Sequence, residues 1–284
     1  MSIPIIDTHV HIWDLMKVHY SWLQGDDSIL ARNYLPAELY PQLSKVHVTS
    51  AVLVQAANNL EDTELMLSAA SQNDWIKGVV GWVPLQDPSK TQALIENWKA
   101  TNTYLKGIRH LIHNEANENW LLQDSVIESL KILAHHHITY DIVGVKEAHL
   151  KAAITIAEKI PNLNLVLDHL NNPPMTNQSE MDRWRTNIKV AAQLKNIHAK
   201  ISGLAMATGQ FETWTSADIH ASIEYALEQF GTDRCFCGGD WPVSLLAGGY
   251  VKTIQAYRTI IENCLPVIDQ EKVFNKNAAL FYQL

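Results

Sequence analysis

The chain has 284 residues, of which 47% are hydrophobic and 18% charged, and its formal net charge is −8. This composition excludes a disordered or fibrous chain, and an acidic balance without a dense basic run excludes an extended nucleic-acid or anionic-membrane surface. No apolar run reaches membrane-spanning length and no signal-peptide pattern is present, so we expect a cytoplasmic protein. Cys235, Cys237 and Cys264 lack the spacing of a zinc knuckle or redox pair and are expected to be reduced.

The first predicted strand, Ile5–His11, is rich in β-branched residues and ends in two histidines separated by one residue. Side chains alternate along a strand, so His9 and His11 are predicted to project from the same face. Two imidazoles on one face suit a divalent metal or a set of hydrogen-bond donors. The motif by itself is equally compatible with two polar rings at a solvated edge.

A segment without clear period, 14–35, follows and contains Tyr20 and Trp22, and the chain then alternates between two patterns. Apolar runs typical of strands occur at Val48–Ala57, Lys77–Leu85, Leu105–Ile112, Ile138–Val145, Asn164–Leu170, Ile197–Leu204 and Arg234–Trp241. Helical periods occur at Leu60–Asn73, Pro88–Asn102, Asn119–His136, Lys146–Ile160, Glu180–Leu194, Ala217–Phe230, Gly249–Asn263 and Asp269–Tyr282. The alternation predicts an α/β protein with parallel strands, a (β/α)8 TIM-type barrel forming a single domain over residues 1–284.

Polar residues gather where the predicted strands end, which is where a parallel barrel carries its catalytic groups. Burying such groups without partners is costly, so convergence on one site is the simplest explanation. Alternation places Asp168 and His169 on opposite faces, and we expect His169 to point inward. The candidates are His9, His11, Gln55, Trp82, Arg109, His110, Asp141, Asp168, His169, Lys200, Ser202, Asp240 and Trp241, with His113, Asn114 and Glu115 as weaker ones.

Three of these candidates have specific chemical interpretations. Arg109 suits bidentate binding of a substrate oxygen or carboxylate. Lys200 fits a catalytic role and an internal ion pair equally well. Asp240 lies in Cys-Gly-Gly-Asp-Trp-Pro, where the glycines let backbone approach an occupant closely. A carboxylate there can take a proton from water near the paired histidines, which predicts a hydrolytic general base.

With these residues in place, the chain resembles the amidohydrolase superfamily and, within it, the sugar-acid lactonase branch of L-fuconolactonase- and L-rhamnonolactonase-like enzymes of carbohydrate metabolism. The resemblance runs from about residue 3 to 283 and rests on motifs at 20–23 (YSWL), 107–110 (GIRH), 167–170 (LDHL), 200–204 (KISGL) and 239–243 (GDWPV). It implies a metal-binding hydrolase whose catalytic residues and metal ligands are His9, His11, His169 and Asp240. The fourth and fifth strands offer Arg109 and Asp141 instead of the lysine and histidine of binuclear members, so we expect one metal ion, zinc, or metal-independent catalysis.

The resulting hypothesis is hydrolysis of a small lactone, a sugar-acid 1,4-lactone of the L-fucono or L-rhamnono type, by an aspartate-activated water. The predicted substrate-binding residues are Arg109, Trp22, Tyr20, Trp241, Gln55 and Lys200. Two alternatives are a metal-dependent decarboxylase of a small unsaturated or aromatic acid and a catalytically silent sugar-acid-binding barrel. The expected partner is a small-molecule substrate, with no nucleic acid and no membrane, and homo-oligomer formation is left open.

Overall fold

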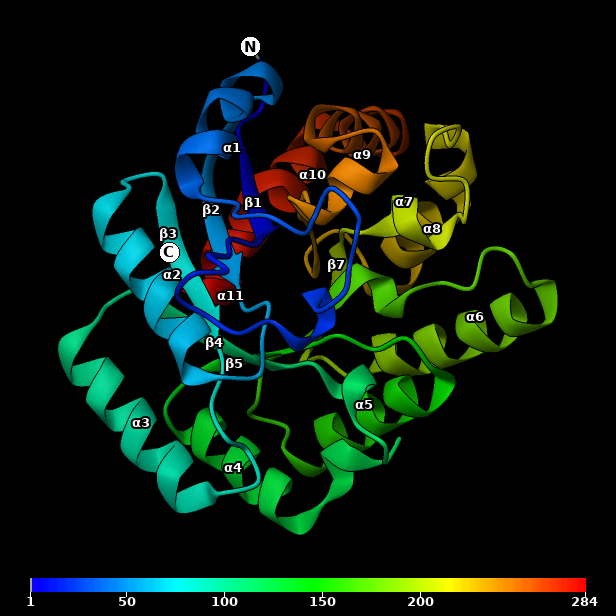
Figure 1. Cartoon of the computed structure of the whole chain (residues 1–284). Coiled ribbons are helices and arrows are strands. Elements are labelled where there is room, and N and C mark those ends of the chain that lie inside the picture. The colour runs from blue at the N-terminus through cyan, green and yellow to red at the C-terminus, as the bar shows by residue number, and fades with distance from the viewer. Residues whose placement is uncertain (1) are drawn as a thin grey trace.

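The computed structural model describes residues 2–284 and shows a ring of strands surrounded by helices (Figure 1). Within these residues, eight strands pair in chain order, each parallel to the next. The ring closes where Val10 bridges Trp241, just beyond the last strand. This architecture confirms the predicted (β/α)8 barrel. The strands are β1 (Ile5–Val10), β2 (Val48–Val54), β3 (Ile76–Gly81), β4 (Leu105–His110), β5 (Thr139–Ile142), β6 (Leu165–Leu167), β7 (Ile197–Ile201) and β8 (Cys235–Cys237).

Helices cover the outside of the ring, and several begin at side chains that accept from backbone N–H groups of the first turn. Asn59 accepts from the Asp62 nitrogen, Asp87 accepts from the Lys90 nitrogen, and Thr215 forms a reciprocal capping box with Asp218. None of the helices in residues 2–284 combines the length and apolar character needed to cross a membrane. The α-helices are α1 (Pro36–Leu43), α2 (Leu60–Gln72), α3 (Pro88–Thr101), α4 (Asp124–His135), α5 (Glu147–Lys159), α6 (Gln178–Gln193), α7 (Leu204–Ala207), α8 (Ser216–Phe230), α9 (Tyr250–Cys264), α10 (Val267–Glu271) and α11 (Asn277–Tyr282).

Shorter helical turns join these elements. They are η1 (Ser21–Leu23), η2 (Ser44–Val46), η3 (Ile112–Asn114), η4 (Trp120–Leu122), η5 (Asp168–Asn171), η6 (Val243–Ala247) and the π-helical η7 (Lys272–Lys276). The predicted helix 119–136 is therefore divided into η4 and α4, and the predicted helix 269–282 spans α10, η7 and α11. Helix α1 was not predicted, because Pro41 inside it is a helix breaker, although Pro36 at its first turn was a usable start signal.

All eight strands end earlier than predicted, and at β6 and β8 this changes where the polar residues lie. Strand β6 stops at Leu167 and β8 at Cys237, so the residues that follow belong to connecting segments. Asp168 and His169 lie in η5, and Asp240 lies three residues beyond β8. Alternation along a strand consequently does not govern the directions of these side chains.

The barrel interior is closed at its amino-terminal end by the last helix. Phe281 and Tyr282 of α11 pack with Ile6, Val52 and Phe236, which point into the ring from β1, β2 and β8. Lys106, near the start of β4, donates from Nζ to the carbonyl of Gln283 at 2.8 Å. Figure 1 shows α11 within the ring of strands. The opposite, carboxyl end is where the strand-end polar residues meet.

Candidate active site

Three metal-ligating side chains meet where the barrel closes. His9 lies near the end of β1, His11 directly follows that strand, and Asp240 follows the neighbouring strand β8. Asp240 Oδ1 lies 3.4 Å from His11 Nε2 and 3.8 Å from His9 Nε2. The two imidazole centroids are 4.8 Å apart, which confirms that the rings share one side of the strand. The Asp240 nitrogen donates to the His9 carbonyl at 2.7 Å, so both segments are held in register.

The backbone around Asp240 permits an unusually close approach between β1 and β8. Asp240 has a φ of 53°, a left-handed conformation that is sparsely populated by residues other than glycine. A Cβ on Gly238 would lie 2.4 Å from the Cβ of His9. Glycine is therefore required at this position, since the two strands could not otherwise bring Asp240 and His9 together.

Asp7 joins the same two segments through hydrogen bonds. Its carboxylate accepts from the backbone nitrogens of His9 at 2.9 Å and Gly239 at 2.8 Å, and from the Tyr250 hydroxyl at 2.7 Å. Burial raises the pKa of Asp7 to about 6, against the opposing effect of these three donors. Asp7 was not among the residues predicted from the sequence, although its D-x-H-x-H spacing with His9 and His11 was a usable signal.

The tautomer of His11 is directed by a backbone carbonyl. Nδ1 of His11 lies 2.7 Å from the Val54 oxygen at the end of β2, and only an N–H can bond there. Nε2 therefore carries the lone pair, and it faces Asp240. A histidine whose second nitrogen is fixed in this way is oriented for metal binding or for accepting a proton.

His169 reaches the same centre through an irregular turn. Its ring centroid lies 4.5 Å from that of His9, and its Nδ1 lies 2.9 Å from the Ser202 hydroxyl. His169 has a φ of 55°, and a Cβ on Gly203 would lie 2.4 Å from His169 Nδ1. Asp168 also points into the site, so the expectation that only one of this pair points inward was wrong. The left-handed turn that begins at His169 explains why both reach the centre.

A buried ionic cluster lies beneath the histidines. Lys200 Nζ is 2.5 Å from Asp141 Oδ2 and 2.8 Å from Asp168 Oδ1. Arg109 donates to Asp168 Oδ2 at 3.1 Å and also to the backbone carbonyl of Gln55. All four charged side chains are almost fully inaccessible. Since two cations face two carboxylates, the cluster compensates its own charge, and Lys200 is placed in an internal ion pair.

This cluster fixes the protonation of His9. Arg109 Nη1 lies 3.2 Å from His9 Nε2 and Lys200 Nζ lies 3.4 Å from His9 Nδ1, so a cation that can only donate faces each ring nitrogen. Nδ1 lies 3.5 Å from Asp168 Oδ1. Burial lowers the pKa of His9 well below its usual value, which keeps the ring neutral. Burial alone would raise the pKa of Asp168, but Lys200 and Arg109 hold it well below its usual range.

A cavity of about 280 Å³ opens above these groups. Its lining includes five of the predicted site residues: His11, Arg109, His169, Asp240 and the aromatic Trp22. The weaker candidates His113 and Asn114 also line it. The apolar lining residues, which the sequence analysis did not select, are Trp13, Ala56, Leu111, Val143 and Val243.

Other predicted substrate-binding residues lie behind this lining. The Tyr20 hydroxyl donates to Asp62 at 2.8 Å, and this bond directs Tyr20 away from the cavity. Trp22, which lines the cavity, donates to the Ala56 carbonyl at 2.8 Å. Trp241 is fully buried in edge contact with Tyr34. Gln55 and Lys200 contact Arg109 and the carboxylates rather than the open space. The structure thus places these residues as supports of the lining.

The strand-end residues of β3 and β4 form a separate group. Trp82 Nε1 donates to His110 Nδ1 at 3.0 Å, and His110 Nε2 lies 2.7 Å from Glu115. The His110 ring stacks on Trp120 with a centroid distance of 3.9 Å. His110 is consequently held by its own partners and does not line the cavity.

The donor set at the barrel mouth fits one divalent ion. Ligand atoms of His9, His11 and Asp240 all lie within 4.8 Å of one another, and the lone pair of His11 Nε2 is directed toward the shared space. Two nitrogens and one carboxylate oxygen leave an open coordination position, as in catalytic zinc sites. The Arg109 guanidinium next to His9 Nε2 would oppose a cation at that nitrogen by like-charge repulsion.

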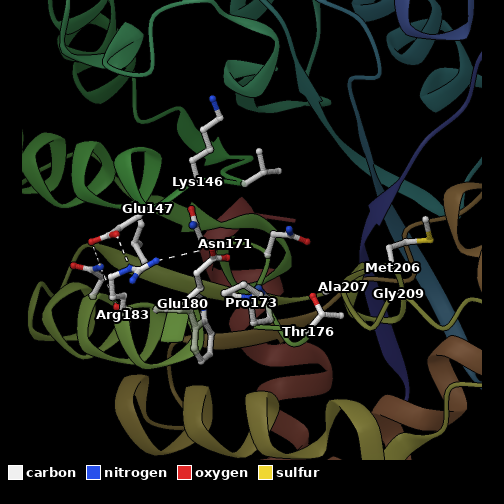
Figure 2. Close-up of a pocket in the computed structure, with 16 residues that line it drawn as sticks. Lys146, Glu147, Asn171, Pro173, Thr176, Glu180, Arg183, Met206, Ala207 and Gly209 are labelled. Carbon is white, nitrogen blue, oxygen red and sulfur yellow. Dashed lines mark hydrogen bonds and ion pairs between the residues drawn. The ribbon is translucent and has the colours of Figure 1, made fainter. Parts of the chain in front are cut away.

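A larger hollow of about 600 Å³ lies outside the barrel mouth, between α5 and α6 (Figure 2). Its charged side chains form ion pairs with each other or with neighbouring residues. Arg183 Nε lies 3.2 Å from Glu147, toward which it points in Figure 2, and Lys146 lies 2.7 Å from Glu118. None of the histidines gathered at the barrel mouth lines this hollow, so the smaller cavity is the one with reactive groups.

Comparison with known proteins agrees with this geometry. The amidohydrolase family profile matches residues 6–284. An L-fucono-1,5-lactonase of Burkholderia ambifaria is 29% identical over 294 residues, covering 98% of this chain and 95% of the relative. An L-fucono-1,5-lactonase of Burkholderia multivorans is 28% identical over 287 residues, covering 98% and 96%. The crystal structure of an amidohydrolase from Burkholderia multivorans with bound zinc superimposes with a TM-score of 0.90 at 27% identity and covers 99% of both chains.

Proposed function

The chain belongs to the amidohydrolase family, and from that premise we propose that it hydrolyses a small sugar-acid lactone of the L-fucono type. One observation carries the proposal. The Asp240 carboxylate lines a small cavity beside two imidazoles, in a position to take a proton from a water molecule held there. The names of two relatives, both L-fucono-1,5-lactonases, support the substrate class.

In this proposal the protein residues divide the reaction between them. Asp240 removes a proton from water as the oxygen attacks the lactone carbonyl, and the carbonyl oxygen becomes an oxyanion. Arg109 and His169 line the same cavity and donate hydrogen bonds to the substrate oxygens. When the tetrahedral intermediate collapses, the ring C–O bond breaks and the protonated Asp240 returns its proton to the leaving alkoxide. The product is the open-chain hydroxy acid.

The surrounding groups hold these residues in place. With the Ser202 hydroxyl donating to His169 Nδ1, the Nε2–H of His169 is the donor free for substrate. The carboxylate of Asp168 and the carbonyl of Gln55 fix the Arg109 guanidinium. Trp22 and the apolar lining exclude water and provide a surface on which a sugar ring packs.

We further propose that His9, His11 and Asp240, with His169 beside them, hold a single divalent ion such as zinc. A bound ion would polarise the lactone carbonyl and lower the pKa of the attacking water. Removal by chelation and restoration by zinc, each followed by turnover and metal analysis, measures how far the reaction depends on it.

The proposal includes two sizes of lactone ring. The sequence motifs favour a 1,4-lactone, whereas the two relatives are named for a 1,5-lactone. The 1,4-lactone ring closes through O4 and leaves the O5 hydroxyl free, whereas the 1,5-lactone ring closes through O5 and leaves the O4 hydroxyl free. A panel of L- and D-sugar-acid lactones of both ring sizes, followed by acid release in weakly buffered indicator, decides between them.

The decisive experiment combines this panel with an Asp240→Asn variant. We expect turnover of the best lactone to fall by about 100- to 10,000-fold while the circular dichroism spectrum is unchanged. Asp182→Asn, at an exposed carboxylate of α6, is the matched control and should retain full activity. Near-normal turnover by Asp240→Asn would disprove the mechanism. Release of CO2 from a carboxylic acid without ester cleavage would identify a decarboxylase, and tight binding without turnover would identify a sensor.

A further inference from the structure

A second set of metal-ligating side chains lies between two outer helices. His220 and Glu224 are four residues apart on α8 and therefore share one helix face. Cys264, the last residue of α9, approaches them from the neighbouring helix. The His220 Nε2 atom lies 3.7 Å from Cys264 Sγ and 3.8 Å from Glu224 Oε2. Ligand atoms of all three residues lie within 4.8 Å of one another.

The three donors match the ligands of a borderline divalent ion. Zinc binds thiolate sulfur at about 2.3 Å and imidazole nitrogen at about 2.0 Å, so two such ligands of one tetrahedral ion lie roughly 3.5 Å apart. The separation of 3.7 Å between Cys264 Sγ and His220 Nε2 is close to this value. One nitrogen, one sulfur and one oxygen leave a fourth position for water. A hard ion such as Mg²⁺ prefers oxygen ligands alone and does not fit this set.

Access and charge also suit an ion here. His220 and Glu224 are accessible to solvent and Cys264 is half-buried, so an ion reaches the cluster without opening the fold. Binding would release the Cys264 thiol proton to solvent, and the Glu224 carboxylate would then neutralise part of the metal charge.

We propose that His220, Glu224 and Cys264 form an accessory site for zinc or a similar borderline divalent ion, which would cross-link α8 and α9. The site shares no residue with the catalytic cavity. Because its ligands come from two helices that pack against each other, a bound ion would join them by coordinate bonds and stabilise the folded chain over the unfolded one. The proposed ion has a structural role, and catalysis does not require it.

Cobalt(II) titration tests this site without interference from the barrel mouth. The ligands proposed at the mouth are nitrogen and oxygen atoms, and the other two cysteines, Cys235 and Cys237, are buried. Thiolate-to-cobalt charge-transfer absorption in the near ultraviolet therefore reports on Cys264. We expect this band to grow to saturation in the full-length protein and to be displaced by zinc. It should disappear in Cys264→Ser, and zinc should then raise the thermal midpoint less than it does in the parent protein.

Matched variants separate a three-ligand site from binding by a single thiol. His220→Ala and Glu224→Gln should each weaken the cobalt band, whereas Glu228→Gln, one helical turn further along α8, should leave it unchanged. Lactone turnover should be unchanged in all four variants, so this outcome is independent of the proposed function. The absence of a thiolate band in the parent protein, or a band that persists at full strength in His220→Ala and Glu224→Gln, would overturn the proposal.

Discussion

The hydroxyl of Tyr282 donates to Oδ2 of Asp141 at 2.6 Å, so the last helix of the chain ends against the charge cluster inside the barrel. The same Asp141 oxygen lies 2.5 Å from Lys200 Nζ. Lys200 in turn contacts Asp168, which holds Arg109 at the cavity wall. The C-terminal residues therefore support the candidate active site from the opposite end of the barrel.

Tyr282→Phe should destabilise the protein by about 1–3 kcal/mol, because it removes a donor from a buried carboxylate. Urea unfolding measures this change. Tyr225→Phe is the matched control, since the Tyr225 hydroxyl donates to the Arg185 carbonyl at the surface, and it should cost much less. Equal losses in the two variants would contradict the role of the Asp141 contact.

Lys200→Met should destabilise the fold by about 3–5 kcal/mol, because Asp141 and Asp168 would lose a shared buried cation. The double variant Lys200→Met, Asp141→Asn should lose less than the sum of the two single changes, since the unpaired carboxylate is then removed. Additive losses in this double-mutant cycle would show that the two groups do not interact.

Gly203→Ala should reduce lactone turnover through His169. Gly203 has a φ of +61°, and an added Cβ would lie 2.4 Å from His169 Nδ1. Gly25→Ala is a control with the same backbone strain, because Gly25 has a φ of +75° and nothing within 4 Å of its added Cβ. Both variants should lose some stability, but only Gly203→Ala should lower kcat. Comparable kcat values would show that His169 tolerates the displacement.

Acidification should destabilise the protein through His198, which packs on Phe281 at 4.6 Å between ring centroids. Burial lowers the pKa of His198 to about 4 in the folded chain, whereas the unfolded chain titrates near 6.5. The unfolded state thus binds the proton first, and stability is lost as the pH falls below about 6.5. Between pH 7 and pH 5 this group accounts for roughly 2 kcal/mol. Urea unfolding of His198→Phe at pH 7 and pH 5 should therefore show a smaller loss of stability than in the parent protein. An equal loss of stability in the two proteins would contradict the role of His198.

Features that depend on local sequence pattern could be predicted from the sequence. The shared direction of His9 and His11 follows from strand alternation, and the parallel barrel follows from eight alternating units. The directions of side chains beyond the strand ends could not be predicted from the sequence. Asp168 and His169 both point inward because η5 starts immediately after β6 and turns left-handed at His169.

The sequence by itself determined the barrel, the identity of the strand-end polar residues and the pairing of two histidines, because hydrophobic periodicity and side-chain alternation are local properties. The tertiary structure alone decided which polar groups bond to each other. Asp7 with Tyr250 and Asp141 with Tyr282 are separated by 243 and 141 positions. Such contacts depend on barrel closure and on the packing of the last helices, which no local pattern encodes. Because the barrel closes, Lys200 lies in a buried ion pair, and Tyr20 and Trp241 lie behind the cavity lining.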